Sequence, residues 1–540
     1  MGGLDAGNVV DAPRAEHRTR PEHGPQLRER GDGGGERRQL FLHQHLHDAD
    51  EVVDVGRGQA GHNSIGHAHD PHSARDRRTG PTGLNSSFVS ENLTRTERLD
   101  RLPYTRKHNK LLFGSGVGWA LDAMDVGLIS FIMAALIQEW GLGRAEQSAL
   151  ASVGFIGMAL GASLGGLLAD KIGRRQVFAL TLLVYGVATG ISALSTGLVM
   201  LIALRFIVGL GLGGELPVAS TLVSEFAPKR IRGRIVVALE SFWAVGWLAA
   251  ALIGYFLVPL ENGWRWALAL GAIPAIWSVV IRFSLPESVR FLESKGRHEE
   301  AEEVVADWER AAGITPPAAP VDAQHTKAPK TTMRELFGPR FRRRTIALWL
   351  TWFGVNFAYY GAFIWIPTLL HEGGMTLVKS FEFTLLMTLA QLPGYLVAAI
   401  LIETWGRRPT LVTFLAGSAV AAVGFGMAPQ LAEAIAPGSG AWGYGMAMLF
   451  GCLLSFFNLG AWGALYAITP EVYPTTGRAS GAGAATAFGR IAAMLAPILV
   501  PLIVVAGLPV LFAIFGAMFL LAMVAAWFLP EQRGVALEER

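Results

Sequence analysis

Six ionisable side chains lie inside long apolar stretches of the sequence, where an ionised group is costly. They are four acids and two bases: Asp122, Asp125, Glu215, Glu240, Arg205 and Arg490. Even on insertion scales, such a group costs roughly 2.5 to 3.5 kcal/mol in hydrocarbon, so these side chains are expected to face a cavity and one another. Because acids outnumber bases, proton uptake can relieve the surplus negative charge. The set therefore predicts a buried, proton-binding site.

Two of the acids are candidates for carrying the proton. Asp122 and Asp125 are three residues apart, which places them on one face of a helix. Neighbouring carboxylates disfavour joint ionisation, so one of the two can hold a proton and later release it.

Arg490 is the candidate for binding an anion. Its planar guanidinium presents paired N–H donors that suit a carboxylate. The aromatic residues that could cover an apolar ring beside it are Trp243, Tyr359, Trp462 and Tyr466. This combination predicts a small aromatic or heterocyclic carboxylate as ligand. Two alternatives stay open: Arg490 pairs with Glu215 or another acid, and the aromatic residues only pack or lie at membrane interfaces.

The composition indicates what must position these residues. Of 540 residues, 51% are hydrophobic and 16% are charged, against roughly 25% charged in average soluble domains. Repeated apolar runs of about twenty residues are long enough to span a bilayer as helices. The net charge of +3 is too small to indicate nucleic-acid binding. The single Cys452 excludes a disulfide framework and a cysteine-built metal site.

The apolar runs predict an all-α polytopic membrane protein with twelve transmembrane helices in two six-helix halves. The expected spans lie near 111–137, 149–169, 176–195, 198–223, 235–258 and 264–283, and then near 345–370, 381–402, 409–428, 441–469, 481–505 and 508–529. The two bundles are therefore 111–283 and 345–529. A polar linker at 284–344 joins them, a segment at 89–110 precedes them and a tail at 530–540 follows them.

Loop charges predict the orientation. Short loops on one side contain ten basic residues: Lys171, Arg174, Arg175, Lys229, Arg230, Arg232, Arg234, Arg407, Arg408 and Arg478. The other side contains two, Arg144 and Lys379. Because basic loops stay in the cytosol, both termini and the linker are expected there, in a multi-pass protein of the plasma membrane. In the linker, Pro286-Glu287-Ser288 and the amphipathic stretch Arg297 to Arg310 predict short helices on the inner membrane face.

Both halves carry the same pair of charged loops. The first loop contains Asp170, Gly173, Arg174 and Arg175 in one half, and Glu403, Gly406, Arg407 and Arg408 in the other. The second contains Glu225, Arg232 and Arg234 in one half, and Glu471 and Arg478 in the other. Such repetition indicates two equivalent halves. Salt bridges between neighbouring spans could form a cytosolic gate that breaks on opening; the alternative is that these charges only set the topology.

Residues 1–88 differ from the rest of the chain. They hold nine of the thirteen His and eleven Arg, but no Lys, Trp, Tyr or Cys. This bias is typical of a disordered tail, and also of GC-rich DNA translated from an upstream start. We take a natural start at Val89 as the hypothesis. Histidine clusters such as His43, His45 and His47 leave a zinc or nickel site as the alternative.

From 105 to 540 the chain resembles the major facilitator superfamily, on the strength of the duplicated loops. Arg205-Phe206-Ile207-Val208-Gly209, Pro286-Glu287-Ser288 and Pro530-Glu531-Gln532 are similar to motifs of its sugar porters. Gly118-Trp119-Ala120-Leu121-Asp122-Ala123-Met124-Asp125 and Leu239-Glu240-Ser241-Phe242-Trp243 resemble metabolite:proton symporters, and bacterial nicotinate permeases most. The resemblance implies a monomeric transporter that works by alternating access without a bound cofactor.

The resemblance also implies roles for single residues. Asp125 matches the first-helix aspartate of proton-coupled sugar porters and Arg205 matches its arginine partner, so protonation of Asp125 would release Arg205. A permanent structural ion pair is the alternative. Glu240 and Tyr466 fall where sugar porters have a sugar-binding glutamine and a tryptophan. The seventh helix lacks their paired glutamines, which makes a hexose less fitting, and offers instead Asn356, Tyr359 and Tyr360. Arg490 resembles the anion-recognising arginine of organic-anion transporters.

One motif is misleading. Gly209-Leu210-Gly211-Leu212-Gly213-Gly214 matches the G-x-G-x-x-G pattern of dinucleotide-binding loops. That pattern requires a preceding strand and a loop at a helix start. These glycines lie inside an apolar run, so we expect them to permit close helix contact.

Together these features predict a proton-coupled importer of a small, nicotinate-like organic acid. The expected substrate site comprises Arg490, Glu240, Tyr466, Trp462, Asn356, Tyr359, Tyr360, Glu215 and Trp243, and the expected proton-coupling residues are Asp125, Asp122 and Arg205. The alternatives are a benzoate-like acid symporter, a sugar symporter, a drug exporter and a non-transporting nutrient sensor. Without a Walker sequence, or a nucleophile or metal cluster beside the carboxylates, an enzyme is not expected.

Overall fold

The computed structural model describes residues 93–317, 333–435, 437, 444–473 and 478–531, which belong to one compact unit, Gly83–Arg540. These residues form helices and connecting turns, with no strand among them. The predictions made for residues 1–88, including the start at Val89 and the histidine clusters, fall outside the described part. The tail beyond Glu531 does so too.

Long apolar helices make up the first half. They are α2 (Arg106–Trp140), α3 (Arg144–Ile172), α4 (Arg174–Ser192), α5 (Leu198–Phe226), α6 (Arg232–Phe256), and the pair α7 (Gly263–Leu270) and α8 (Ile273–Ser284). Short helices follow in the linker: α9 (Val289–Ser294), α10 (His298–Ala311) and α11 (Met333–Leu336). The two linker helices predicted from sequence correspond to α9 and α10.

The second half repeats the pattern. Its helices are α12 (Arg342–Phe363), α13 (Ile366–Glu372), α14 (Leu377–Leu389), α15 (Gln391–Thr404), α16 (Arg407–Gly426), α17 (Ala428–Ile435), α18 (Tyr444–Ile468), α19 (Arg478–Ile503) and α20 (Leu508–Trp527). Among the described residues, eleven helical segments are long and apolar enough to cross a membrane. The pair α12 and α13, bent by 44°, gives a twelfth. The predicted all-helical, twelve-span fold is therefore confirmed.

Three of the predicted spans are interrupted rather than continuous. The breaks separate α7 from α8, α12 from α13, and α14 from α15. In each case the first segment ends four residues before a proline, at Leu270, Phe363 and Leu389. Proline has no N–H to donate to the carbonyl four residues earlier, and its ring clashes with that carbonyl. This local chemistry favours a break, although α19 continues through Pro497 and Pro501.

Glycines bring α3 and α5 into close contact. A methyl group on Gly161 would overlap the carbonyl of Leu210, and one on Gly213 would overlap the carbonyl of Met158. The two helix backbones therefore approach more closely than any larger residue would allow. This is the packing role expected for the glycine-rich run of α5, and it leaves no loop that could hold a dinucleotide.

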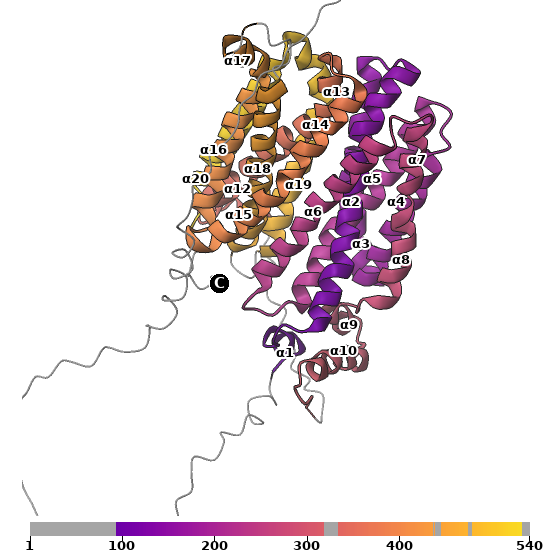
Figure 1. The fold of residues 1–540 in the computed structure, drawn as a ribbon. Helices are drawn as coiled ribbons and strands as arrows, with labels where there is room; N and C mark the ends of the chain where they lie inside the picture. Colours follow the sequence, from indigo (N-terminus) through magenta and orange to yellow (C-terminus); the bar gives the residue numbers. More distant parts are fainter. Residues whose placement is uncertain (1–92, 318–332, 436, 438–443, 474–477, 532–540) are drawn as a thin grey trace, which may run out of the picture. The chain divides into compact units, whose positions relative to one another are not determined.

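The two halves meet along a few helices. In Figure 1 the first-half helices, indigo to magenta, stand beside the second-half helices, orange to yellow. Across the boundary α3 packs against α19, and α6 packs against α14 and α18. These contacting helices carry most of the residues that the sequence predicted for a substrate cavity.

A charged cluster joins the N-terminal segment to the linker. Helix α1 (Arg95–Asp100) packs against α10. Arg98 donates to Glu309 at 2.6 and 3.0 Å, and both side chains are almost fully buried, at 1% and 0% exposure. Burial lowers the pKa of the Arg98 guanidinium, but its hydrogen bonds to Glu309 and Glu302 outweigh burial, so the pKa is raised. Arg98 therefore stays charged and holds α1 on the linker.

Candidate functional site

A cavity lies where the two halves meet. It contains about 280 Å³ of space free of protein atoms, part of it open to solvent. The side chains around it come from α6, α12, α15, α18 and α19: Glu240, Trp243, Tyr359, Tyr360, Tyr395, Trp462, Tyr466 and Arg490.

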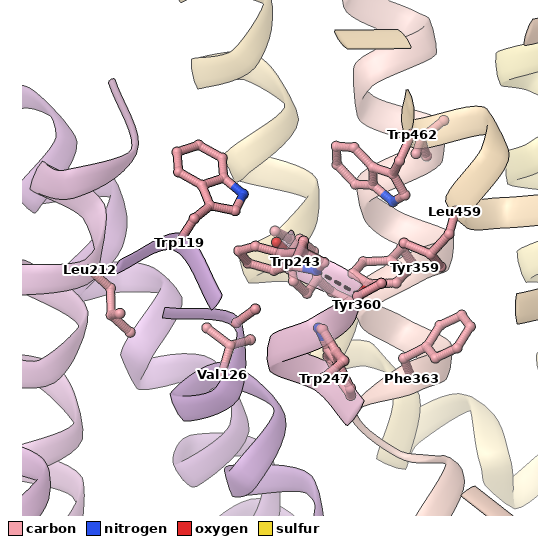
Figure 2. Close-up of a cluster of buried hydrophobic side chains, with 14 of the residues drawn as sticks. Trp119, Val126, Leu212, Trp243, Trp247, Tyr359, Tyr360, Phe363, Leu459 and Trp462 are labelled. Carbon is pink, nitrogen blue, oxygen red and sulfur yellow. Dashed lines mark hydrogen bonds between the residues drawn. The ribbon is translucent and has the colours of Figure 1, made fainter. Parts of the chain in front are cut away.

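Aromatic rings form most of the wall. Figure 2 shows Trp243 and Tyr359 meeting, with Trp247, Phe363 and Trp462 around them. The Trp243 indole N–H donates to the Tyr359 hydroxyl at 2.9 Å, which joins α6 of one half to α12 of the other. On α18, the rings of Trp462 and Tyr466 stack with centroids 5.7 Å apart. A flat ring could stack or pack edge-on against these side chains.

The cavity contains one acid and one base. Arg490 on α19 donates to the Tyr360 hydroxyl at 3.2 Å. Glu240 on α6 is buried, and its Oε1 has no hydrogen-bond partner among the described residues. Among the described residues, Glu240 and Arg490 form no salt bridge with each other. Each charge is therefore available to a ligand that offers complementary groups.

Seven of the nine predicted substrate residues line the cavity, and two do not. The Asn356 amide donates to the carbonyl of Trp352, one turn earlier on α12, at 2.7 Å. Glu215 lies within the first half, where its Oε1 would be 3.0 Å from a methyl group on Gly118 of α2. Both side chains are buried, but they face other helices. Position in an apolar run indicates burial without telling which neighbouring helix a side chain meets.

Sequence reasoning missed one lining residue, Tyr395. It lies on α15 and is buried against the cavity. A tyrosine in the middle of an apolar stretch was the available signal, because its hydroxyl needs a polar partner there.

Asp125 and Arg205 lie in contact in the first half. Arg205 Nη1 is 3.1 Å from Asp125 Oδ2, and both side chains are buried. The Thr189 hydroxyl on α4 donates to Asp125 Oδ1 at 2.6 Å. Thr189 was not among the predicted residues. The pair borders a largely apolar cavity with about 350 Å³ of free space between α2, α3 and α5.

Asp122 does not share the contacts of Asp125. Both of its carboxylate oxygens lack a hydrogen-bond partner among the described residues. It faces Glu215 and Tyr185, although Asp125 is one turn away on the same helix. The two aspartates expected to act as a pair therefore have different partners.

In the first half, the charged loops join neighbouring helices at the end of the molecule where α9 and α10 lie (Figure 1). Arg174 approaches Glu225 at 3.5 Å and Asp170 at 4.0 Å. Glu287 of the Pro-Glu-Ser motif accepts from the backbone N–H groups of Arg174 and Arg175 at 2.8 and 3.2 Å. This motif therefore caps the start of α4.

The second half repeats this arrangement. Arg407 approaches Glu471 at 3.2 Å and Glu403 at 4.0 Å. Glu531 accepts from the backbone N–H groups of Arg407 and Arg408 at 3.1 and 2.9 Å, so it caps α16 as Glu287 caps α4. The glycines before these caps have φ of +105° at Gly173 and +114° at Gly406, a region that other residues rarely adopt.

Among the described residues, most salt bridges of the predicted gate stay within one half. Arg232 pairs with Asp100 of α1, also in the first half. Arg234 is the exception, because its Nε is 3.6 Å from Glu403 Oε1 across the boundary. Arg478 begins α19, and its side chain lies outside the described part of the chain.

Residues 121–540 match the family described as sugar (and other) transporters. The chain belongs to this transporter family. The niacin transporter NiaP of Acinetobacter baylyi is 48% identical over 409 residues, which cover 76% of this chain and 90% of the relative. The NiaP protein of Bacillus subtilis is 46% identical over 418 residues, 77% of this chain and 94% of the relative.

Solved structures of a xylose transporter share the fold. The partially occluded, inward-open xylose transporter XylE from E. coli aligns with a TM-score of 0.63 and 19% identity, covering 80% of this chain and all of that one. The proton:xylose symporter XylE with a bound bromodeoxyglucose aligns at 0.61 and 21%, covering 81% and 99%. The predicted membership of the major facilitator superfamily is confirmed. As a member of this transporter family, the chain is a multi-pass membrane transporter rather than an enzyme.

Proposed function

We propose that this transporter imports a small aromatic carboxylate of the nicotinate type together with protons. The observation that carries the proposal is the pairing of Arg490 with an aromatic wall in a cavity between the two halves. The 48% identity to a niacin transporter supports the same substrate class. The proton gradient would drive uptake, and the cycle would need no bound cofactor.

In this proposal Arg490 binds the substrate carboxylate. Its guanidinium can present two parallel N–H donors to the two carboxylate oxygens. Trp462 and Tyr466, already stacked on each other, would cover one face of the substrate ring. Tyr360 holds the guanidinium in place through its hydroxyl.

Glu240 would recognise the ring nitrogen. A pyridine nitrogen accepts a hydrogen bond from a protonated carboxyl, and a pyridinium N–H donates one to a carboxylate. Either form gives Glu240 Oε1 the partner that it lacks among the described residues. A benzene ring presents only C–H groups at that position, so Glu240 would favour pyridine carboxylates over benzoate.

Asp125 would be the coupling residue. As an anion it holds the Arg205 guanidinium and the Thr189 hydroxyl. A proton on Asp125 would remove the charge that attracts Arg205 and free α2 to move relative to α5. Substrate binding and protonation would then together favour the conformation that crosses the membrane.

The two halves would rock around the cavity, with both termini and the α9–α10 end in the cytosol. The concentration of basic loop residues at that end supports this orientation. Arg234 and Glu403 would belong to the gate on that side, because they join the halves and must separate when it opens. The protein would work as a monomer.

Uptake of labelled substrates tests the proposal. Cells expressing the full chain are given nicotinate, nicotinamide, benzoate or glucose at external pH 6 and 8, with and without a protonophore. We expect nicotinate to accumulate, more at pH 6, and the protonophore to abolish accumulation. Glucose uptake would replace the substrate class with sugars, for which the family match and the XylE fold give grounds. Resistance to toxic organic compounds without any uptake would instead indicate export.

A further inference from the structure

Asp122 on α2, Glu215 on α5 and Tyr185 on α4 form a buried polar cluster in the first half. Asp122 is 1% exposed, and Glu215 and Tyr185 are 0% exposed. Both oxygens of each carboxylate and the tyrosine hydroxyl lack a hydrogen-bond partner among the described residues. Buried polar groups are nearly always satisfied, so five such atoms in one place require an explanation.

The backbone geometry brings these side chains together. Gly118 lies one turn before Asp122 on α2, and a methyl group there would be 3.0 Å from Glu215 Oε1. Gly211 lies one turn before Glu215 on α5, and a methyl group there would be 2.8 Å from Tyr185 Cβ. The two glycines therefore allow α2 and α4 to pack closely on α5, and the three polar side chains face one another.

Among the residues that the structure describes, no cation forms a salt bridge with either carboxylate. The charged groups that act on Asp122 are Glu215, Asp125 and, from the second half, Arg490. Arg490 donates to the hydroxyl of Tyr360. Arg205, a buried arginine on α5, is bound to Asp125 and Thr189. Asp122 therefore experiences the charges of both Asp125 and Arg490.

Two ionised carboxylates are unstable in this position. At a separation of about 4 Å and an effective dielectric constant near 20, two like charges repel by roughly 4 kcal/mol. One proton between them removes the repulsion and lets one carboxyl donate to the other, as in paired carboxyls elsewhere. The tyrosine hydroxyl can donate to a remaining oxygen.

We propose that Asp122, Glu215 and Tyr185 form a second proton-binding site, separate from the Asp125–Arg205 pair. The two carboxyls share one proton, which binds from one side of the membrane and leaves to the other during the cycle. This inference rests on the proposed function, which is the uptake of a carboxylate together with protons. With one proton at each site, two protons accompany one carboxylate anion, and each cycle moves one net positive charge.

Accumulation against a proton gradient tests the stoichiometry. Full-length protein is reconstituted in liposomes whose membrane potential is clamped at zero. The ratio of internal to external nicotinate concentration is then measured at several pH differences across the membrane. Two coupled protons give a ratio that rises about 100-fold per pH unit, and one gives about 10-fold. We expect about 100-fold for the native protein and about 10-fold for the double variant Asp122→Asn with Glu215→Gln. Glu382→Gln, a partly exposed carboxyl on α14, serves as control and should remain at about 100-fold.

Infrared spectroscopy provides a readout that does not need transport. In purified protein, the carbonyl stretch of a protonated carboxyl should titrate with pH. We expect Asp122→Asn and Glu215→Gln each to remove the same band, whereas Asp125→Asn leaves it in place. Tyr185→Phe should shift the band, since it removes one donor.

The outcomes are distinct. A ratio of about 10-fold in the native protein, or unchanged spectra in both single variants, overturns the second site and leaves the proposed function standing. Uptake driven by a sodium gradient and lost in Asp122→Asn also overturns it, because the cluster then holds a metal ion. If the native protein does not exchange nicotinate even without a gradient, the proposed function fails first.

Discussion

At the residue scale, Arg490 carries the anion specificity that we propose. Arg490→Gln removes charge-assisted hydrogen bonds worth about 1.5 to 3 kcal/mol. The KM for nicotinate should therefore rise roughly 10- to 150-fold. Arg490→Lys keeps the positive charge but lacks the planar pair of N–H donors. Its KM for nicotinate should therefore lie between the values for the native protein and for Arg490→Gln. Concentration-dependent uptake by the three proteins checks this order.

Nicotinamide is the matched control for Arg490, since it has the same ring without the carboxylate. Any uptake of nicotinamide should change little in Arg490→Gln. An equal loss for both compounds would mean that Arg490 supports the cavity rather than the carboxylate.

Asp125 pairs with Arg205 and accepts a hydrogen bond from the Thr189 hydroxyl. Asp125→Asn has nearly the same shape but cannot alternate between charged and neutral forms. We expect it to exchange labelled for unlabelled nicotinate across the membrane, but to accumulate nicotinate by at most about 10-fold per pH unit, because only the proton of the Asp122–Glu215 site stays coupled. Counterflow and gradient-driven uptake in liposomes separate these activities. Native accumulation by Asp125→Asn would show that the ion pair with Arg205 is only structural.

Residue identities were largely predictable from the sequence, but partnerships were not. Arg490, Glu240 and Trp243 stand out as polar or bulky groups in apolar runs, and they do line one cavity. Glu215 stood out for the same reason and lies elsewhere. A buried acid must face something polar, but only the packing of α2 on α5 decides that it faces Asp122.

At the element scale, the contact between α3 and α5 depends on glycine. In Gly161→Ala the added methyl meets the Leu210 backbone carbonyl, which cannot move without shifting α5. Overpacking of this kind typically costs about 1 to 3 kcal/mol. Gly166→Ala on the same helix has open space around it and should not destabilise the protein. In thermal unfolding in detergent, the midpoint temperature of Gly161→Ala should be clearly lower than that of Gly166→Ala. Equal midpoints would contradict the packing argument.

Helix α1 should depend on one carboxylate of the linker. Glu309→Gln leaves the buried Arg98 without its main counter-charge, and breaking a buried pair typically costs about 3 to 5 kcal/mol. We expect α1 to detach and trypsin to cleave more rapidly at Arg101. Glu300→Gln, in an exposed pair with Arg297 on the same helix, is the control and should cleave at the native rate. Identical digestion of both variants would show that other contacts hold α1.

At the scale of the whole molecule, contacts between the halves are unevenly distributed. At the α7 and α13 end, Gln138 lies 2.7 Å from His371, and Arg144 donates to the Pro501 carbonyl at 3.1 Å. At the α9 and α10 end, the Arg234–Glu403 pair joins the halves through side chains that are 68% and 43% exposed. Among the residues that the structure describes, different kinds of contact therefore join the halves at the two ends.

The Arg234–Glu403 pair should bias the conformational equilibrium slightly. Exposed pairs are typically worth about 0 to 1 kcal/mol, so Arg234→Glu should shift the populations by at most about fivefold. Spin labels on α6 and α15 should report a larger share of the form open at the α9 and α10 end. The double exchange Arg234→Glu with Glu403→Arg should restore the native distribution. If the single variant leaves the distances unchanged, the pair does not act as a gate.

The sequence by itself determined the class of molecule. A twelve-helix transporter is specified by apolar runs of spanning length, by basic loops and by two copies of the same loop motifs. These features depend only on the hydrophobicity of short segments and on their order along the chain. The breaks at Leu270, Phe363 and Leu389 also have a local cause, but the sequence predicted continuous spans there. Only the tertiary structure decided that Asp125 meets Arg205 and Thr189 while Asp122 meets Glu215, and that Tyr395 joins the cavity. Which helix faces meet depends on contacts between segments far apart in the chain, and the glycines that permit those approaches act only once the helices are packed.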